Sequence, residues 1–391
     1  MTEEHISSTH PPLPPTTEED RFSWLRLLRS RRVGPATFHR LLAEHGTAQN
    51  ALSALPEVAR SAGVDGYEIC PAGVVEAELK AAKAARARLL CLGSPEYPAD
   101  LAQIPDAPPL LWAIGDPTLL QRPMIALVGA RNASSLGTRM ARALAQDLGE
   151  RGFVVVSGLA RGIDAAAHQA ALHTGTIAVQ AGGVDVHYPS ENAALAEDIA
   201  RRGLRLSEQP MGVAPLARHF PARNRIISGL ALGVVVVEAA ARSGSMITAR
   251  DALDQGREVM AVPGHPFDAR ATGCNHLIRD GAALIRDAED VIAALPPRRN
   301  PTLTAAPHPP RQGELLEEAA RLPRAPERRS RAETRALHRR ILDRLGPTPV
   351  AEDQLVRELA LPTDDLGPAL TDLELDGRIR RQAGGLLARF R

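Results

Sequence analysis

Glycine, arginine and serine residues follow several apolar, β-branched runs between residues 125 and 264, and the first such turn reads GARNAS at 129–134. Glycine at the carboxyl end of a parallel strand lets backbone N–H groups face a ligand, and the N-terminus of the next helix adds a positive dipole. We therefore expect the turn at Gly129 to direct Arg131 toward a phosphate group, with Ser134 as a further hydrogen-bond donor. The alternative is a purely structural turn in which Arg131 forms a surface salt bridge.

A second turn of the same kind reads SGLARGID at 157–164. Its candidate phosphate contacts are Ser157, Gly158, Arg161 and Gly162. Asp164 is expected to cap the helix that follows, and His168 lies one helical turn further on. An Asp/His pair can perform acid/base catalysis, but no serine or cysteine nucleophile accompanies it at a recognisable spacing. We therefore favour capping and packing roles for these two residues.

The stretch FPARNR at 220–225 combines an aromatic ring, arginines and an amide at a predicted junction between a loop and a helix. Such residues offer base stacking and phosphate contact within one short segment. The candidate DNA contacts here are Phe220, Arg223, Asn224 and Arg225. The alternative places Phe220 in the core and leaves the arginines solvated.

A further glycine turn, SGSMIT at 243–248, adds Ser243 and Gly244 as candidate phosphate contacts. Glu238 precedes this turn, and a carboxylate is unexpected beside a phosphate. We therefore expect Glu238 to hold a loop by accepting backbone N–H bonds. Several anion-binding turns at the edge of one sheet predict a broad groove for a polyanion rather than a pocket for one small molecule.

Other phosphate-binding motifs are missing from the sequence. The turn at 129–137 is not GxGxxG, because Arg131 stands where the second glycine would be, and no acidic residue ends the next strand to hold a ribose. No GK[ST] string occurs, so the sequence predicts neither a P-loop nor ATP hydrolysis. The three cysteines, at positions 70, 91 and 274, are far apart, and we expect no metal and no cofactor.

These turns need a scaffold that brings strand ends together, and residues 85–295 alternate strand-like and helix-like patterns. Strands are predicted at 88–92, 110–114, 125–129, 153–157, 176–180, 204–207, 233–238 and 258–262, with helices at 138–150, 164–173 and 191–202 among others. The alternation predicts an α/β fold with an extended, Rossmann-like, doubly wound and mostly parallel sheet. Ligands of such sheets bind at the carboxyl ends of the strands, where the glycine turns lie.

Smaller regions precede this sheet in the sequence. Residues 1–20 are acidic and Pro-rich, which predicts a disordered tail and not a signal peptide. Residues 21–80 have a helical pattern, and the VGP turn at 33–35 resembles a helix-hairpin-helix element. The arginines just before it are Arg26, Arg29, Arg31 and Arg32. This region either contacts DNA phosphates or packs on its neighbour.

Residues 296–330 form a Pro/Arg-rich linker, and residues 331–391 predict a separate C-terminal domain. Helices are expected at 333–345, 351–359 and 363–376, followed by two short strands around Gly384-Gly385, which is the winged-helix plan. The third helix carries five acidic residues, which would repel phosphate. We therefore favour protein contact or packing over DNA binding for this domain.

Composition sets looser limits. The chain has 391 residues, enough for two or three domains, with a formal net charge of +1 and 3% aromatic residues. Net charge therefore does not indicate nucleic acid, and few rings are available for base stacking. Lysine occurs only at positions 80 and 83, so arginine must supply the phosphate contacts, although a GC-rich genome produces the same bias. No apolar run is long enough to span a membrane, and unpaired cysteines are typical of a cytoplasmic protein.

The order of these segments closely resembles the DNA processing protein A family, also called DprA or Smf. The segments are GARNAS, SGLARGIDAAAH, FPARNRIISG, EA and SGSMITA within 238–249, and VPG at 262–264. The likeness covers residues 85–295, and the family's helical N-terminus, which is similar to a sterile-alpha-motif or helix-hairpin-helix domain, and its C-terminal winged helix match the flanking regions. It implies a non-enzymatic protein that protects incoming single-stranded DNA during natural transformation and loads RecA on it, often with single-strand-binding protein present.

The same resemblance implies a homodimer formed through the Rossmann domain. It also implies a DNA groove, which the family lines at positions matching Gly129, Arg131, Phe220, Arg223, Asn224 and Arg225. Lysines that relatives often use in this groove are missing here, so arginines must serve.

Two other classes of protein remain open at this point. The same fold superfamily includes nucleotide-processing enzymes, such as phosphoribohydrolases that resemble lysine decarboxylases and are expected to show PGGxGTxxE. Here Glu238 precedes its glycine turn and that string is missing. The third class is a transcription regulator, in which the winged helix reads duplex DNA and the sheet senses a ligand; the acidic third helix argues against it.

Overall fold

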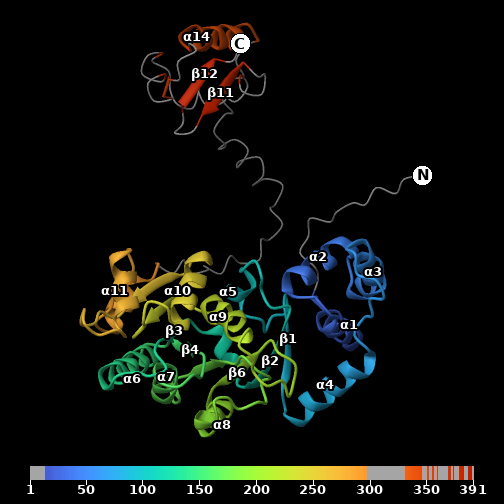
Figure 1. The fold of residues 1–391 in the computed structure, drawn as a ribbon, viewed down its shortest axis with the longest axis vertical. Helices are drawn as coiled ribbons and strands as arrows, with labels where there is room; N and C mark the ends of the chain where they lie inside the picture. Colours follow the sequence, from blue (N-terminus) through green and yellow to red (C-terminus); the bar gives the residue numbers. More distant parts are fainter. Residues whose placement is uncertain are drawn as a thin grey trace, which may run out of the picture. The chain divides into compact units, whose positions relative to one another are not determined.

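The computed structural model describes residues 14–296 and 331–345, together with positions 350–351, 355, 359, 369–370, 373, 378–382 and 386–389 of the C-terminal region. The chain divides into two compact units, Met1–Arg298 and Arg299–Arg391. The helical region predicted at 21–80 and the sheet predicted at 85–295 therefore lie in one unit (Figure 1). Apart from Pro296, the predicted linker at 296–330 lies outside the described residues.

The first unit is built on a nine-stranded sheet. Its strands are β1 (Arg88–Cys91), β2 (Leu110–Gly115), β3 (Met124–Val128), β4 (Val154–Ser157), β5 (Thr176–Val179), β6 (Leu204–Ser207), β7 (Gly233–Val236), β8 (Glu258–Ala261) and β9 (Ala283–Leu284). They are ordered β1-β2-β6-β5-β4-β3-β7-β8-β9 across the sheet. All neighbours from β6 to β9 in this order are parallel, whereas β2 pairs antiparallel with β1 and β6. The predicted Rossmann-like sheet and its two-strand extension are confirmed, and the two-residue β9 is too short to show a pattern in sequence.

Helices cover both faces of this sheet (Figure 1). They include α6 (Ser135–Glu150), α7 (Ile163–Ala171), α8 (Ala193–Arg202), α9 (His219–Leu230), α10 (Gly244–Asp254), α11 (Thr272–Arg279) and α12 (Ala288–Ala294). Alternate residues of β3 enter opposite layers, so Ala126 and Val128 join the core with α9 and α10, while Ile125 and Leu127 join the core with α6 and α7. Because β3 is buried on both faces, its sequence is a continuous apolar run.

Four helices precede the sheet: α1 (Glu18–Arg29), α2 (Pro35–His45), α3 (Ala48–Ser61) and α4 (Ala72–Ala84). α1 begins at Glu18, inside the tail that was predicted to be disordered. Thr17 and Asp20 form a reciprocal capping box there, which satisfies the backbone N–H groups of both residues and stabilises the start of the helix. The prediction of disorder is therefore wrong for residues 18–20.

A buried ion pair fixes these helices to the sheet. Arg29 of α1 and Glu78 of α4 are 2.8 Å apart, with side chains 12% and 5% exposed. The indole N–H of Trp112 in β2 donates to the same carboxylate at 2.7 Å. Arg26 donates to the backbone carbonyl of Cys70. Two of the four arginines near the VGP turn therefore serve packing rather than contact with DNA.

In the second unit the structure describes α14 (Arg331–Arg344) and a three-stranded antiparallel sheet in the order β10 (Val350–Ala351), β12 (Leu386–Arg389) and β11 (Ile379–Gln382). α14 corresponds to the first predicted helix, and β11 pairs with β12 as the predicted hairpin requires. Ala351 lies in a strand where a second helix was predicted to begin. Gly384-Gly385 and most of the acidic segment at 363–376 lie outside the described residues.

Candidate nucleic-acid interface

Two hollows lie at the carboxyl ends of the parallel strands. The strand order reverses at β3, because β4 and β7 pair with its opposite edges, and doubly wound sheets bind ligands at such a point. The first hollow, here the β3–α10 hollow, has a volume of about 550 Å³ and is lined by Gly129, Asn132, Ser243, Gly244 and Arg270 among others. The second, here the Tyr188 hollow, has a volume of about 300 Å³ and is lined by Leu159, Arg161, Tyr188, Pro189 and Pro215 among others.

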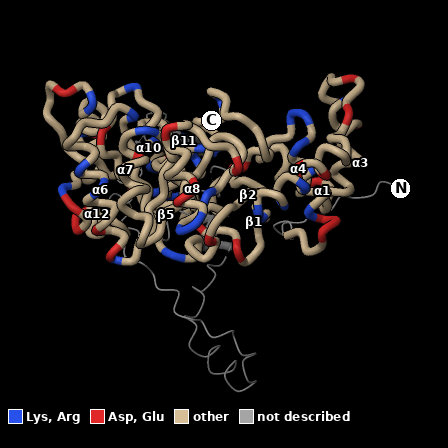
Figure 2. The backbone as a smooth tube through the Cα atoms, turned by 90° about the horizontal axis from the view of Figure 1, so that it is seen from below, with Lys and Arg blue, Asp and Glu red and all other residues tan. Residues whose placement is uncertain are grey.

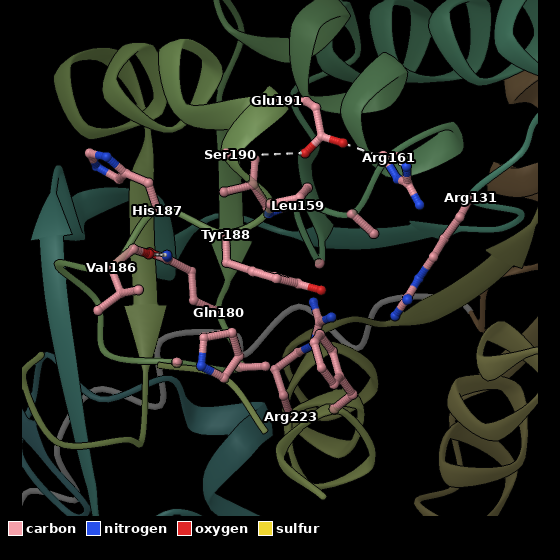
Figure 3. A pocket seen from close by; sticks show the side chains of 17 residues that line it. Arg131, Leu159, Arg161, Gln180, Val186, His187, Tyr188, Ser190, Glu191 and Arg223 are labelled. Carbon is pink, nitrogen blue, oxygen red and sulfur yellow. Dashed lines mark hydrogen bonds and ion pairs between the residues drawn. The ribbon is translucent and has the colours of Figure 1, made fainter. Parts of the chain in front are cut away.

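The two hollows share a wall made of Arg131, Ala160, Phe220 and Arg223. The guanidinium carbon of Arg131 lies 5.3 Å from the centroid of the Phe220 ring, which is a cation–π contact. Arg131 is exposed and forms no salt bridge within the described part of the chain, so the structure does not show the surface salt bridge of the alternative interpretation. Figure 3 shows the side chains of Arg131 and Arg223 pointing toward one another beside Tyr188.

Arg223 is the most buried charged group of this wall, with 5% of its surface exposed. Its Nη1 donates to the carbonyl oxygen of Val179 at 2.9 Å, and its buried Nε has no hydrogen-bond partner among the described residues. Burial lowers the pKa of Arg223 to about 10, which the nearby Asp164 carboxylate opposes, so the guanidinium stays charged at neutral pH.

Gly158 makes room for this arginine. A Cβ on Gly158 would lie 1.7 Å from Nη1 of Arg223, so glycine is needed here for the approach of a guanidinium and not of a phosphate. Gly129 is likewise constrained by packing, because a Cβ would lie 2.9 Å from the carbonyl oxygen of Glu238. Both glycines line the hollows for steric reasons, and because the N–H of Gly158 is donated to Asp164, the prediction that Gly158 contacts phosphate is not supported.

The N-terminus of α10 opens into the β3–α10 hollow. Nothing lies within 4 Å of a Cβ built on Gly244, so this backbone is accessible. The first-turn N–H groups of a helix have no intrahelical partner and attract anions. Ser243, the N-cap residue, contacts the hydroxyl of Ser245 at 2.8 Å and lines the same hollow. The structure therefore keeps Ser243 and Gly244 as candidate anion contacts.

The N-terminus of α6, in contrast, is already occupied by a carboxylate of the protein. The backbone N–H of Ser134 donates to Oε2 of Glu238 at 2.9 Å, and the Ser134 hydroxyl donates to the other carboxylate oxygen. The same hydroxyl accepts the N–H of Gly137. The loop-holding role predicted for Glu238 is confirmed. Ser134 is a helix cap, and the prediction that it contacts phosphate is not supported.

The turn after β4 is filled in the same way. One carboxylate oxygen of Asp164 accepts the N–H groups of Gly158 and Ala160 at 3.1 and 3.3 Å. Burial raises the pKa of Asp164 despite the opposing charge of Arg223. The N-cap of α7 is Gly162, so Asp164 does not cap the helix as predicted; it accepts bonds from the preceding turn instead.

His168 holds a third N–H group of this turn. Its Nε2 accepts the N–H of Leu159 at 3.3 Å, and its Nδ1 lies 2.7 Å from the hydroxyl of Thr176, which donates to the carbonyl oxygen of Val155. Burial, followed by the charge of Arg223, lowers the pKa of His168 to about 3, so the imidazole is neutral. Asp164 and His168 thus have separate structural duties, which agrees with the packing role favoured above.

Two further predicted contacts of this turn, Ser157 and Gly162, have packing roles. The hydroxyl of Ser157 is fully buried and donates to the carbonyl oxygen of Leu127 at 2.6 Å. Gly162 has φ of 77°, and a Cβ there would lie 2.2 Å from the carbonyl oxygen of Ala130, so it lets two turns pack together. Ser157 is therefore not free to contact DNA, and Gly162 is required by the packing of the two turns. Arg161 is exposed in the Tyr188 hollow, where it lies 3.5 Å from Glu191 in a solvent-screened pair.

The FPARNR segment lies inside α9 rather than at a loop-to-helix junction, and this decides which arginine faces the hollows. Residues two apart on a helix point in nearly opposite directions. Arg223 therefore lines both hollows, whereas Arg225 lies 2.5 Å from Glu208 and 3.3 Å from Asp106, outside them. The prediction that Arg225 contacts DNA is not supported.

Asn224 lines the β3–α10 hollow and donates to the carbonyl oxygen of Gly244 at 3.3 Å, which joins α9 to α10. Sequence reasoning missed Tyr188 and Arg270, which line the Tyr188 hollow and the β3–α10 hollow. Tyr188 is 48% exposed, and its ring centroid lies 5.8 Å from that of Phe220. An aromatic residue after a predicted strand end, in a chain with few aromatics, is the signal that could have found it.

Charges of both signs are interspersed along the chain (Figure 2), so the positive character of the hollows is local. Their lining carboxylates, Asp164 and Glu191, already hold backbone N–H groups and Arg161, respectively. The wall arginines and the α10 N-terminus can therefore bind an anion, and the aromatic side can stack a ring. Among the described helices, none is long and apolar enough to cross a membrane.

Fold and hollows together define a doubly wound α/β protein with an arginine-lined cleft suited to an anionic ligand. Residues 88–296 match the family model of DNA recombination-mediator protein A. Residues 18–81 match the DprA-like N-terminal HHH domain, and residues 325–385 match the DprA winged helix domain. The chain therefore belongs to the DNA processing protein A family, a family of DNA processing and recombination.

Individual relatives agree with this assignment. The chain is 50% identical over 199 residues to DNA processing protein DprA of Streptococcus pneumoniae. This match covers 50% of this chain and 70% of the relative. It is 47% identical over 210 residues to DprA of Bacillus subtilis, and this match covers 53% of this chain and 71% of the relative. The X-ray structure of the Streptococcus pneumoniae protein matches with a TM-score of 0.56 and 36% identity over 70% of this chain and 93% of that chain. The structure of a Helicobacter pylori DNA processing protein A is described for its single-stranded DNA binding mode. It matches with a TM-score of 0.50 and 30% identity, and the match covers 53% of this chain and 94% of that chain.

Proposed function

We propose that this protein binds single-stranded DNA in the two hollows, protects it, and loads RecA on it during natural transformation and recombination. The observation that carries the proposal is the guanidinium of Arg223, buried and charged beside the exposed Arg131. Its Nη1 is engaged by Val179, and its buried Nε has no hydrogen-bond partner among the described residues.

A phosphodiester satisfies what this site lacks. A buried guanidinium needs acceptors for its N–H groups, and Asp164, which supplies counter-charge nearby, already accepts two backbone N–H groups. Arg131 and the α10 N-terminus add positive potential from the other sides of the shared wall. A phosphate placed between these groups would receive charge-assisted hydrogen bonds, which are the stronger kind.

Unpaired strands are favoured over duplex because aromatic rings lie beside the arginines. Proteins that bind single strands combine a basic groove with rings on which bases stack, and the contact between Phe220 and Tyr188 provides such rings. The relative from Helicobacter pylori is described for its single-stranded DNA binding mode, which supports the same ligand for this chain.

Transfer of the strand to RecA is supported by the recombination-mediator family and by the chemistry of the site. A protein that hands over a strand must hold it without cutting it. The carboxylates that line the hollows are Asp164, which accepts two backbone N–H groups, and Glu191, which pairs with Arg161. The alternative of a nucleotide-processing enzyme needs a carboxylate directed at a substrate, so the arrangement gives it less support. We retain a homodimer and cooperation with single-strand-binding protein as parts of the proposal.

The test is a competition between single strands and duplex, followed by a RecA assay. We expect a mixed-sequence single strand to bind in preference to duplex, with affinity that falls steeply as salt rises. The protein should shorten the lag of RecA filament formation on strands coated with single-strand-binding protein. Equal binding of duplex, or an unchanged lag with RecA from the same host, would contradict the proposal. Release of free base from nucleoside monophosphates would favour the enzyme alternative.

A further inference from the structure

A third hollow lies outside the proposed DNA cleft, between α6 and the turn that follows β8. It has a volume of about 420 Å³ and is called the α6 groove below. Its lining includes Val237 and Val262, which directly follow β7 and β8. It shares no lining residue with either of the other two hollows. A ligand of the α6 groove therefore need not displace a ligand of the cleft.

The helix α6 has two apolar stripes, and the second of them faces this groove. The first stripe packs in the core with β3 and consists of Ala141, Leu144, Ala145 and Leu148. The second stripe has the spacing i, i+3, i+4, i+7 of one helix face and consists of Leu136, Arg139, Met140 and Ala143. Leu136 is 68% exposed, so this face is open to a partner.

The polar groups of the groove that lack a partner are hydrogen-bond donors. Among the described residues, the guanidinium of Arg139 has no hydrogen-bond or salt-bridge partner. Nδ1 of His265 accepts the backbone N–H of Phe267 at 3.3 Å, so the ring hydrogen lies on Nε2 and is available to a ligand. An occupant of the groove should therefore bring acceptors, and beside Arg139 a carboxylate is the strongest of these.

The carboxylates that line the groove are already engaged within the protein. Glu238 accepts the backbone N–H and the hydroxyl of Ser134, and Asp268 pairs with Arg270 at 3.0 Å. A nucleic-acid strand carries a negative charge at every nucleotide and would meet both carboxylates. A peptide can instead place one carboxylate at Arg139 and apolar side chains along the rest of the lining. Charge and apolar surface together favour a peptide over a strand.

We propose that the α6 groove binds an acidic segment of a partner protein, with a carboxylate on Arg139 and apolar side chains against Leu136 and Met140. Phe267 is 94% exposed, with its ring centroid 5.5 Å from that of His265, and it offers further apolar surface beside the groove. The inference goes beyond the proposed function, because it adds a protein site that can be occupied while DNA is held.

The position of the groove suits a partner that acts on the bound strand. Ser134 of the groove follows Arg131 of the cleft by three positions in the same turn. A protein anchored in the α6 groove is thereby held close to the DNA, which raises its effective concentration there.

The experiment measures binding of fluorescein-labelled peptides to the full-length protein without DNA. The probe DDLLDLF combines carboxylates with apolar side chains. Two control peptides have the sequences KKLLKLF, in which the charge is reversed, and DDSSDSS, in which the apolar side chains are removed. We expect saturable binding of DDLLDLF, and affinities at least about tenfold weaker for both controls.

Variants then place the peptide in the groove. Arg139→Glu should weaken DDLLDLF by at least about tenfold and strengthen KKLLKLF, because the charge at the contact is reversed. Leu136→Ser should weaken DDLLDLF about tenfold and leave the affinity for a single DNA strand unchanged. Arg142→Glu is the matched control, because Arg142 is exposed on α6 but does not line the groove. Thermal melting checks that each variant is folded.

Several outcomes would overturn the peptide site. These are a lack of saturable DDLLDLF binding at millimolar concentration, equal effects of Arg139→Glu and Arg142→Glu, or displacement of the peptide by a single DNA strand. A change in the sedimentation of Leu136→Ser would show that a second copy covers the groove instead. Since the peptides are measured without DNA, failure of this inference leaves the proposed function intact, and failure of DNA binding leaves this inference to be judged by itself.

Discussion

Replacing Arg223 with methionine should weaken DNA binding while leaving the fold stable. Methionine keeps much of the unbranched stem and removes only the guanidinium. A charge-assisted hydrogen bond contributes about 1.5–3 kcal/mol, so affinity for a single strand should fall about 12- to 150-fold. One phosphate contact fewer should also reduce the slope of log affinity against log salt by about 0.7.

The stability of this variant follows from two opposing effects. Arg223→Met loses the hydrogen bond to the Val179 carbonyl oxygen and the counter-charge of Asp164. It also removes a buried charge, and the lowering of the Arg223 pKa from its usual value to about 10 corresponds to about 3 kcal/mol of disfavoured ionisation. Asp164 keeps the N–H groups of Gly158 and Ala160 when its counter-charge is lost, so these effects offset one another and we expect a free energy of unfolding within about 2 kcal/mol of wild type.

Arg225→Met is the matched control, on the same helix but on the other face. Arg225 lies 2.5 Å from Glu208, so its loss leaves a buried carboxylate unpaired and should cost about 3–5 kcal/mol of stability. Below its melting transition it should bind DNA like wild type. Fluorescence anisotropy with a labelled strand, beside thermal melting, measures both quantities. Wild-type affinity in Arg223→Met, or equal losses of affinity in both folded variants, would refute the proposed groove.

Three further predictions test other parts of the structure. The pKa of His168 is lowered from 6.5 to about 3, so the unfolded chain takes up a proton below pH 6.5 while the folded protein does not. The contribution of His168 to stability is therefore complete above pH 6.5 and lost toward pH 3, about 2 kcal/mol between pH 7 and pH 5. Asp164, whose pKa is raised, acts in the opposite direction, so the difference between wild type and His168→Gln in urea unfolding at both pH values isolates the histidine. Gly162→Ala should lower the melting temperature by several degrees, because its Cβ would lie 2.2 Å from a backbone oxygen, whereas Gly244→Ala should leave it unchanged; the reverse order would contradict the assigned turn geometry. A chain that ends at residue 298 should bind single strands within tenfold of full length in a gel-shift titration, and a larger loss would place the C-terminal region in the DNA site.

The fold was largely predictable because strand and helix patterns are local. Buried strands such as β3, β4 and β7 each leave an apolar run of their own in the sequence, whereas β6 is interrupted by Arg205. The exceptions have local causes as well. The capping box at Thr17 was concealed by an acidic, Pro-rich context, and β9 has only two residues.

The site was predictable only in part. Arg131 and Arg223 both line the hollows. Local motifs in the sequence, the turn after β3 for Arg131 and the FPARNR segment for Arg223, were enough to select these two residues. Tyr188 was missed, because a single aromatic in a loop gains meaning only from its contact with Phe220, 32 positions away along the printed sequence. The DNA contact predicted for Arg225 is not supported, because a residue two positions from Arg223 lies on the other face of the helix, where it pairs with Glu208.

The sequence by itself determined where backbone N–H groups would be presented, since glycine conformation and helix starts are local properties. Tertiary structure decided what those groups would hold. Glu238, 104 residues from Ser134, fills the start of α6, and Asp164 fills the turn after β4. A buried N–H group must be paired, and an internal carboxylate satisfies it as well as a phosphate does. Which turn remains open to DNA therefore depends on which side chains the fold brings to it.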